Sequence, residues 1–157
     1  SDPSDAYDYQ WFLVPKALLQ AQILALMGQS DAAARQYDSA RIMLEEKIRA
    51  QPDDDRYYGS LGIAYAGLGR KKEAIDAGKR GMELCPMTKE AWRATYRIED
   101  MARIYTMVGE YEEAVKNLDF LLSVPAEVSI AWLLGDPTWA PIRNHPGFQE
   151  LIRKYRR

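Results

Sequence analysis

The spacing Tyr58-x-x-Leu61-Gly62-x-x-Tyr65, followed by Ala74 and Pro86, decides the fold of this chain. Apolar residues that recur at three- and four-residue steps lie on one face of a helix. The proline at the end stops the second helix, because proline lacks the N–H that a helix interior needs. The stretch therefore predicts two antiparallel helices joined by a short turn, over about 55–68 and 71–84.

The same signature recurs on both sides of this stretch. A glycine lies at each expected turn and an alanine follows it five residues later, which gives Gly28, Gly69 and Gly109 with Ala33, Ala74 and Ala114. The intervals (69 − 28 = 41 and 109 − 69 = 40) exceed the usual period of about 34 residues for such helix pairs by seven and six. An excess of about two helical turns lengthens a helix without rotating its buried face far.

The extra residues fall in two different places. In the first unit an apolar stripe from Ala33 to Ile48 runs on towards Pro52, so the second helix is expected to be long. Between the second and third units the extra residues lie around 87–95, as a loop or as extra turns of the next helix. We favour extra helix, because Glu90-Ala91-Trp92-Arg93 are mostly good helix formers.

The pattern as a whole predicts an all-α chain. No run of β-branched residues alternates convincingly with polar ones, so no strand is expected. From residue 124 four prolines interrupt any long helix, and the apolar residues of this segment are expected to cap the open end of the helix array. The expected helices span about 14–27, 30–50, 55–68, 71–84, 90–108 and 111–123, with shorter ones at 127–134, 138–143 and 147–155.

The chain resembles the tetratricopeptide repeat family over about residues 14–125. The central repeat carries the likeness most strongly, the third is supported by Ala102, Tyr105 and Gly109, and the first is weaker. The resemblance implies a right-handed α-solenoid of three helix pairs, about 14–52, 55–88 and 90–125. An N-terminal extension (1–13) would precede the pairs, and a capping segment (126–157) would follow them.

A narrower resemblance concerns large bacterial signalling proteins, in which such repeats accompany a serine/threonine kinase, an adenylate cyclase or a winged-helix regulator. Three stretches carry it: Val14 to Leu19, Leu61 to Arg70, and Asp136 to Arg143 with Pro146-Gly147-Phe148. It implies that the chain is an accessory region of a larger protein. A regulatory or self-association module of such a protein is therefore the alternative to the function reached below.

The resemblance also indicates where binding would occur, because the first helix of each pair lines the concave side of such an array. The candidate protein-binding residues at inward positions are Leu18, Gln22, Arg56, Ile63, Tyr96, Glu99, Arg103 and Thr106. Glu99 and Arg103 are four residues apart and can pair on one helical face. They form either a structural ion pair or part of a peptide site, with Arg103 meeting a carboxylate and Tyr96 giving an amphipathic contact.

Some members of the family grip the carboxylates at a chaperone's C-terminus with lysine, asparagine and arginine. The matching positions here hold Leu18, Gln22, Ser60, Tyr96 and Asp100. The chain lacks this set of basic and amide groups, so we expect no binding of that acidic tail motif. Another part of the parent chain could fill the groove instead.

Two glycines depart from the family pattern. Gly78 and Gly81 stand where a large apolar residue and an alanine are usual, and each costs a helix roughly 1 kcal/mol against alanine. They mark either close packing, with the space filled by a neighbour such as Trp92, or a pocket or flexible joint in the middle repeat.

The composition argues against most other functions. His145 is the only histidine and Cys85 the only cysteine, so no metal cluster, cofactor site or catalytic triad is expected. The net charge of −2 is too small to indicate nucleic acid as the partner, and no apolar run approaches about 20 residues, the length that spans a bilayer. A single cysteine slightly favours the cytoplasm and leaves the periplasm open. The sequence thus predicts a non-catalytic scaffold that binds a peptide or helix of a protein partner in its concave groove.

Overall fold

Helices make up most of residues 5–156, the part of the chain that the computed structural model describes. Residues 1–4 and 157, which belong to the expected N-terminal extension and capping segment, lie outside the described residues. The all-α expectation is confirmed for the main elements. The helices are α1 (Lys16–Leu26), α2 (Ser30–Ala50), α3 (Asp55–Gly67), α4 (Lys71–Leu84), α5 (Ala91–Met107), α6 (Tyr111–Ser123), α7 (Ile130–Gly135), the 3₁₀ helix η2 (Pro137–Ile142) and α8 (Pro146–Tyr155).

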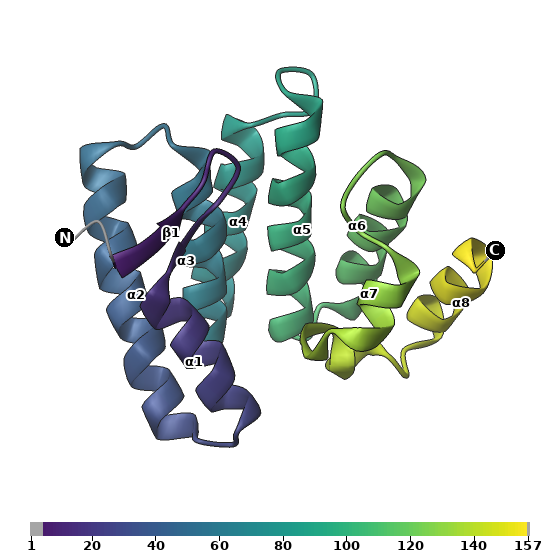
Figure 1. Ribbon diagram of the computed structural model, residues 1–157, viewed down its shortest axis with the longest axis horizontal. Helices are drawn as coiled ribbons and strands as arrows, with labels where there is room; N and C mark the ends of the chain where they lie inside the picture. Colours follow the sequence, from purple (N-terminus) through teal and green to yellow (C-terminus); the bar gives the residue numbers. More distant parts are fainter. Residues whose placement is uncertain (1–4, 157) are drawn as a thin grey trace.

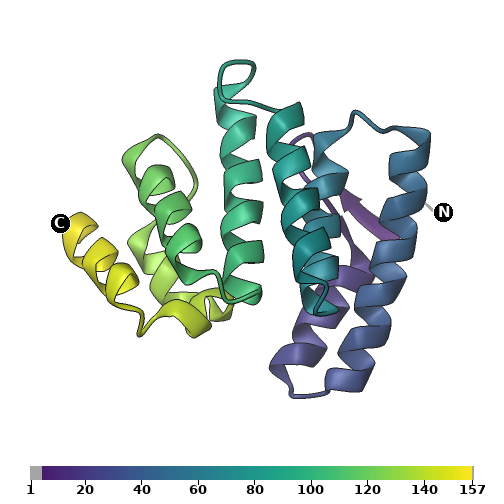
Figure 2. The same ribbon diagram turned by 180° about the vertical axis from the view of Figure 1, so that it is seen from behind.

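Consecutive helices pack in pairs, α1 with α2, α3 with α4 and α5 with α6. The pairs also contact each other, because α3 packs against both α2 and α5 and α4 packs against α5. Figure 1 views the side on which α1 and α7 lie, and Figure 2 shows α4 and α6 on the opposite side. A buried cluster links the first two pairs to α5 and includes Leu18, Tyr37, Ala64 and Met101.

The glycine at each turn has a positive φ angle, 74° at Gly28, 72° at Gly69 and 81° at Gly109. A helix often ends with a residue in this left-handed region, which costs glycine least because it has no β-carbon. The three glycines therefore end α1, α3 and α5 and let the chain turn back into the second helix of each pair.

The residues by which the two glycine intervals exceed the period of about 34 lie close to the places expected from the sequence. The helix α2 has 21 residues against 14 in α4, which accounts for the excess of seven in the first interval. In the second interval, α5 has 17 residues against 13 in α3, and the connection between α4 and α5 runs over 85–90. Both a longer helix and a longer loop therefore contribute there, whereas the sequence favoured helix alone.

The expectation that the chain has no strand was wrong. Strands β1 (Ala6–Asp8) and β2 (Leu13–Pro15) form an antiparallel hairpin in which Tyr7 faces Val14. Each strand has only three residues, too few to show a period-two pattern in the sequence. The buried side chain of Leu13 fixes the hairpin in a cluster with Leu44 and Leu61. Part of the expected N-terminal extension is thus a packed element of the fold.

The segment after α6 folds back onto α5 and α6. Its apolar side chains share one buried cluster with Ala102, Leu118 and Leu121 of those helices; the contributions from this segment are Val128, Leu133, Trp139, Ile142, Phe148, Leu151 and Ile152. The helices α7, η2 and α8 lie close to the three short helices expected at 127–134, 138–143 and 147–155. Burial of these side chains covers the outer side of the last helix pair, which would otherwise expose apolar surface.

Gly78 marks a close approach of α4 and α5, whereas a β-carbon at Gly81 would make only ordinary van der Waals contacts. A β-carbon at Gly78 would lie 2.6 Å from Met101 Sδ and 2.8 Å from Ile104 Cδ1, so the ends of these two side chains would have to shift to admit it. At Gly81 it would lie 3.4 Å from the Asp55 carbonyl oxygen. The side chains that fill the space at Gly78 are Met101 and Ile104, further along α5 than Trp92, whose side chain is 42% exposed.

Candidate functional site

The hairpin lies on the first helices of the second and third pairs. Three side chains of α3 and α5 donate hydrogen bonds to its backbone carbonyls: Arg56 Nη1 to Tyr9 (2.7 Å), Arg97 Nη2 to Trp11 (3.1 Å) and Ser60 Oγ to Leu13 (2.5 Å). The acceptors are residues 9, 11 and 13, every second residue of the segment. Residues 9–12 form the turn between the two strands, so this face holds the backbone of the turn and of Leu13 through donors from its side chains.

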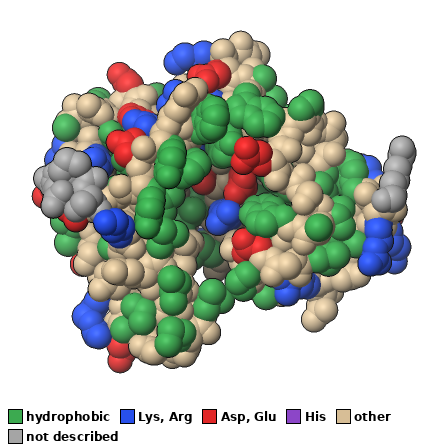
Figure 3. Space-filling view, viewed as in Figure 1, with side chains coloured by type: hydrophobic (Ala, Val, Ile, Leu, Met, Phe, Trp, Pro, Cys, Tyr) green, Lys and Arg blue, Asp and Glu red, His purple; other side chains and the backbone are tan. Residues whose placement is uncertain are grey.

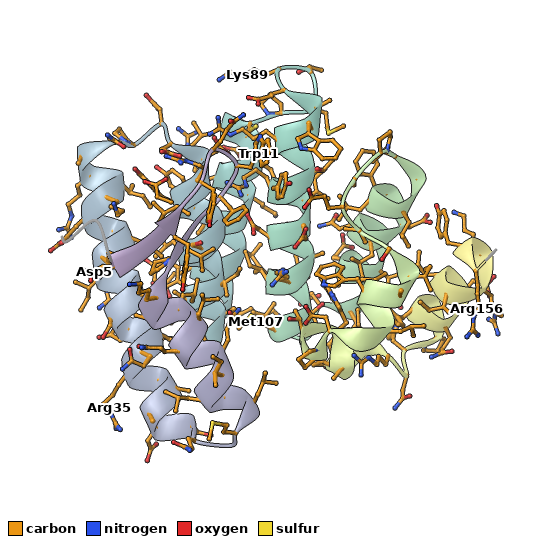
Figure 4. The ribbon with its side chains drawn as sticks, viewed as in Figure 1. Asp5, Trp11, Arg35, Lys89, Met107 and Arg156 are labelled. Carbon is orange, nitrogen blue, oxygen red and sulfur yellow. The ribbon has the colours of Figure 1, made fainter. Side chains whose placement is uncertain are left out.

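Aromatic rings add to this contact. The Trp11 ring stacks on Tyr96 of α5, with centroids 6.0 Å apart and planes 4° apart, and Phe12 lies 6.3 Å from the same ring. Figure 4 shows Trp11 near the tip of the hairpin, beside α5. Tyr96 therefore already carries an aromatic contact of the amphipathic kind that the sequence indicated, and its partner is a segment of the same chain.

Next to the hairpin the same face is hollowed into a cavity of about 400 Å³. In Figure 3 acidic and basic side chains are visible in a hollow near the centre of this face, with apolar side chains around them. The hairpin, α1, α3, α5, α7 and the segment before α7 all contribute to the lining. The lining residues are Phe12, Val14, Leu18, Leu19, Gln22, Ser60, Ile63, Tyr96, Arg97, Glu99, Asp100, Arg103, Glu127 and Trp132.

Six of the eight residues expected in the groove line this cavity, namely Leu18, Gln22, Ile63, Tyr96, Glu99 and Arg103. The other two lie elsewhere. Arg56 pairs with Asp54 and Asp8 under the hairpin, and Thr106 is 2% exposed and donates its hydroxyl to the Ala102 carbonyl (2.9 Å).

A buried ion network forms the floor between α3 and α5. The guanidinium of Arg97, 2% exposed, contacts Asp55 (3.1 Å) and Asp100 (3.0 Å) as well as the Trp11 carbonyl. Asp55 also pairs with Arg93. Burying such charges is tolerated only when each one is paired and hydrogen-bonded, so the network fixes Arg97 and leaves it little capacity to bind a ligand.

The expected pair of Glu99 and Arg103 is present in the cavity wall. Arg103 Nη2 lies 2.8 Å from Glu99 Oε1, and the guanidinium also sits over the Trp132 ring at 5.5 Å. Both side chains are mostly covered, at 19% and 23% exposure. The pair is therefore a part of the packed wall, and Arg103 meets a carboxylate of its own chain.

Two acidic side chains in the cavity have shifted pKa values. Burial raises the pKa of Glu99 above its ordinary value, although the neighbouring Arg103 acts in the opposite direction. Burial likewise raises the pKa of Asp100, against the opposing effect of Arg97. Carboxylates that are desolvated in this way gain more from a nearby positive charge than exposed ones do.

Several lining residues were not among the sequence candidates, chiefly Phe12, Arg97, Glu127 and Trp132. The i, i+3 spacing of Arg97 and Asp100 is a signal for an ion pair on one helix face, and it could have been used. Phe12, Glu127 and Trp132 come from segments outside the repeat pattern, so the family positions gave no register for them.

Between residues 5 and 156, no group of three or more histidine, cysteine, aspartate or glutamate side chains could hold a metal ion. Over the same range, no helix combines the length and apolar character needed to cross a membrane.

Comparison with known proteins gives two relatives. The chain is 32% identical over 98 residues to superkiller protein 3 of Schizosaccharomyces pombe and 26% identical over 98 residues to the E3 ubiquitin-protein ligase TTC3 of Rattus norvegicus. Each alignment covers 62% of this chain but only 7% and 5% of the two relatives, so the chain spans a small part of their length. No family profile matches the chain, and no solved structure matches it. The two similarities support the resemblance of this chain to the tetratricopeptide repeat family.

Proposed function

We propose that this chain is a non-catalytic protein-interaction module, a right-handed solenoid of three helix pairs whose groove takes a peptide or helix of a partner. The observation that carries the proposal is the seating of residues 9–13. Arg56, Ser60 and Arg97 each donate to a backbone carbonyl there, a mode of contact that depends little on the sequence of the bound segment. The adjoining cavity provides about 400 Å³ for side chains of a second segment.

The lining of the cavity suits recognition of a protein segment. Leu18, Ile63 and Val14 offer apolar surface, while Tyr96 and Trp132 offer rings that can contact both apolar and polar groups. Half of the fourteen lining residues are polar or charged, and ion pairs hold the guanidinium groups of Arg97 and Arg103 in place. The six lining residues named from the sequence are the residues that we propose contact the partner.

A filling substitution tests the proposal. Gln22 is half-buried and lines the cavity, whereas Gln20 is exposed on the same helix and lies outside the lining. Peptides selected from a displayed random library against the full chain should lose at least about tenfold in affinity for Gln22→Trp. The same peptides should bind Gln20→Trp as they bind the unmodified chain. Peptides that bind all three proteins equally would place the binding site elsewhere and refute the proposal.

A second candidate is a regulatory or self-association module of a larger bacterial signalling protein. The four large apolar side chains that α1 exposes favour it, because such a face can pair with a second copy. This function predicts a mass that rises with concentration in light scattering. A constant monomer mass up to about 100 µM would exclude self-association with a dissociation constant in the micromolar range.

A further inference from the structure

One face of α1 presents an apolar stripe to solvent. Leu19, Ile23 and Leu26 of α1 and Met27 at its C-terminal cap are 37%, 57%, 65% and 63% exposed, and their spacing places them on one side of the helix. Single exposed apolar side chains are common, but four in a row on one helix indicate a docking surface. We call these four residues the α1 stripe.

The α1 stripe is continuous with the cavity. Leu19 belongs to both, and Gln22, one turn further along the same face, also lines the cavity. A rise of about 1.5 Å per residue makes the distance from Leu19 to Met27 about 12 Å along the axis. A partner helix of about three turns is therefore long enough to cover the stripe and still place one side chain in the cavity.

The charges in the cavity favour a positively charged side chain at that end. Three carboxylates line it, from Glu99, Asp100 and Glu127, against the two guanidiniums of Arg97 and Arg103. Behind the lining, Asp55 is paired with both Arg93 and Arg97, and Arg97 also contacts Asp100, so these charges do not offset the excess of carboxylates in the lining. The cavity as a whole therefore carries a surplus of negative charge.

The aromatic residues fit the same kind of ligand. Tyr96, Phe12 and Trp132 contribute rings to the lining, and the Trp132 ring already accepts the guanidinium of Arg103 at 5.5 Å. Ring faces attract lysine and arginine side chains, and the aliphatic part of such a side chain packs against apolar walls. An acidic side chain would meet like charges here and is disfavoured.

We infer that the partner segment is an amphipathic helix. Its apolar face would lie on the α1 stripe, and one lysine or arginine side chain would enter the cavity. This inference rests on the proposed function. Glu99 and Glu127 would receive the cation, with Tyr96 and Trp132 beside it. A second copy of this chain is a poorer occupant, because pairing one stripe with another covers apolar surface but leaves the carboxylates of both cavities without a new partner.

A displayed library of helical peptides tests this inference. Each peptide has about 18 residues, leucine at three positions on one face and random residues elsewhere, and is selected against the full chain. Selected peptides should share a lysine or arginine at one fixed distance from the leucines. Replacing that residue by glutamate should weaken binding in fluorescence anisotropy by at least about tenfold.

Matched variants of the chain locate the two ends of the contact. Ile23→Asp should abolish binding of the selected peptide, whereas Ile42→Asp, at a similarly exposed isoleucine of α2, should leave it unchanged. Glu127→Lys, at an exposed cavity residue, should reduce binding of the lysine peptide and improve binding of its glutamate version. Glu150→Lys on α8 is the control for net charge.

Each other outcome has a definite meaning. Peptides with no preference for a basic residue, or binding unaffected by both Ile23→Asp and Glu127→Lys, would overturn this inference. If Gln22→Trp still weakens binding of the peptides from the random library in that case, the proposed function remains supported although this inference is refuted. A dimer that Ile23→Asp dissociates would show that a second copy covers the stripe, and would also overturn the inference.

Discussion

Gly59 of α3 lies directly against the side chain of Asp100 of α5, so closely that a β-carbon at position 59 would overlap the carboxylate. The missing side chain lets the two helices approach and leaves Asp100 beside Arg97, at 3.0 Å. Gly59 lies on α3 between Arg56 and Ile63, two of the residues expected to face the groove, and its lack of a side chain makes room for Asp100. The charged wall of the cavity thus depends on a residue that contributes no functional group to it.

Gly59→Ala should therefore displace Asp100 and weaken the packing of α3 on α5. Overpacking of this kind costs typically about 1–3 kcal/mol, because the short aspartate side chain has little freedom to move aside. Urea denaturation should show this loss as a lower free energy of unfolding. Gly135→Ala is the matched control, since a β-carbon there meets nothing within 4 Å. Equal stability of the two variants would contradict the close approach of Gly59 and Asp100.

Arg97→Met should be among the most damaging single changes in the chain. Asp55 keeps Arg93 as a partner, but Asp100 loses the cation that it contacts, and an uncompensated buried charge costs about 3–5 kcal/mol. Adding Asp100→Asn to Arg97→Met should recover part of this loss, because it removes the unpaired charge. Arg153→Met, at an exposed ion pair with Glu150, should change the stability little. Additive effects of the two buried substitutions would refute the coupling.

Gly78→Leu should prevent folding or lower the melting temperature strongly. Met101 and Ile104 of α5 already fill the space that the new side chain would need. Circular dichroism during heating measures the effect, and Gly78→Ala should show a smaller loss in the same direction, because Met101 is flexible and can partly move aside. A raised melting temperature for the leucine variant would mean that the middle repeat contains a real void.

The helix pairs could be predicted from sequence because their signals are local and repeated. Gly28, Gly69 and Gly109 set the turns, and the apolar stripes gave all six main helices to within two residues at each end. The seven-residue surplus in α2 could also be placed, because a stripe that continues to Ile48 leaves no room for another element. Because the same turn glycine and apolar stripe occur in all three helix pairs, each pair supports the interpretation of the other two.

The cavity could be predicted only in part, because some of its wall comes from segments outside the helix pairs. Phe12 reaches it from a hairpin whose strands are too short to recognise, and Trp132 reaches it from the segment after α6. Their positions depend on tertiary packing. Leu13 packs the hairpin that carries Phe12 into one buried cluster, and Leu133 packs the helix that carries Trp132 into another. The sequence also could not show that Thr106 is buried, since that depends on where α5 meets its neighbours.

The raised pKa of Glu99 leads to a pH-dependent prediction. Because burial raises the pKa of this carboxyl in the folded state, the folded protein holds the proton more tightly than the unfolded chain does. The stability contributed by neutral Glu99 is fully present below the ordinary value of 4.5 and is lost as the pH rises through the folded value. Glu99→Gln stays neutral at every pH, so its stability relative to the unmodified chain should increase as the pH rises above about 4.5.

Glu73→Gln provides a control with the opposite sign. A hydrogen bond from Arg70 lowers the pKa of Glu73, so its contribution is present above the ordinary value of 4.5 and is lost as the pH falls through the folded value. The relative stability of Glu73→Gln should therefore decrease with rising pH. Urea denaturation of the three proteins between about pH 3 and pH 8 measures both trends. If Glu99→Gln followed the same trend as Glu73→Gln, the attraction of Arg103 would outweigh burial, and the cavity would lack the desolvated carboxylate that makes a basic ligand favourable.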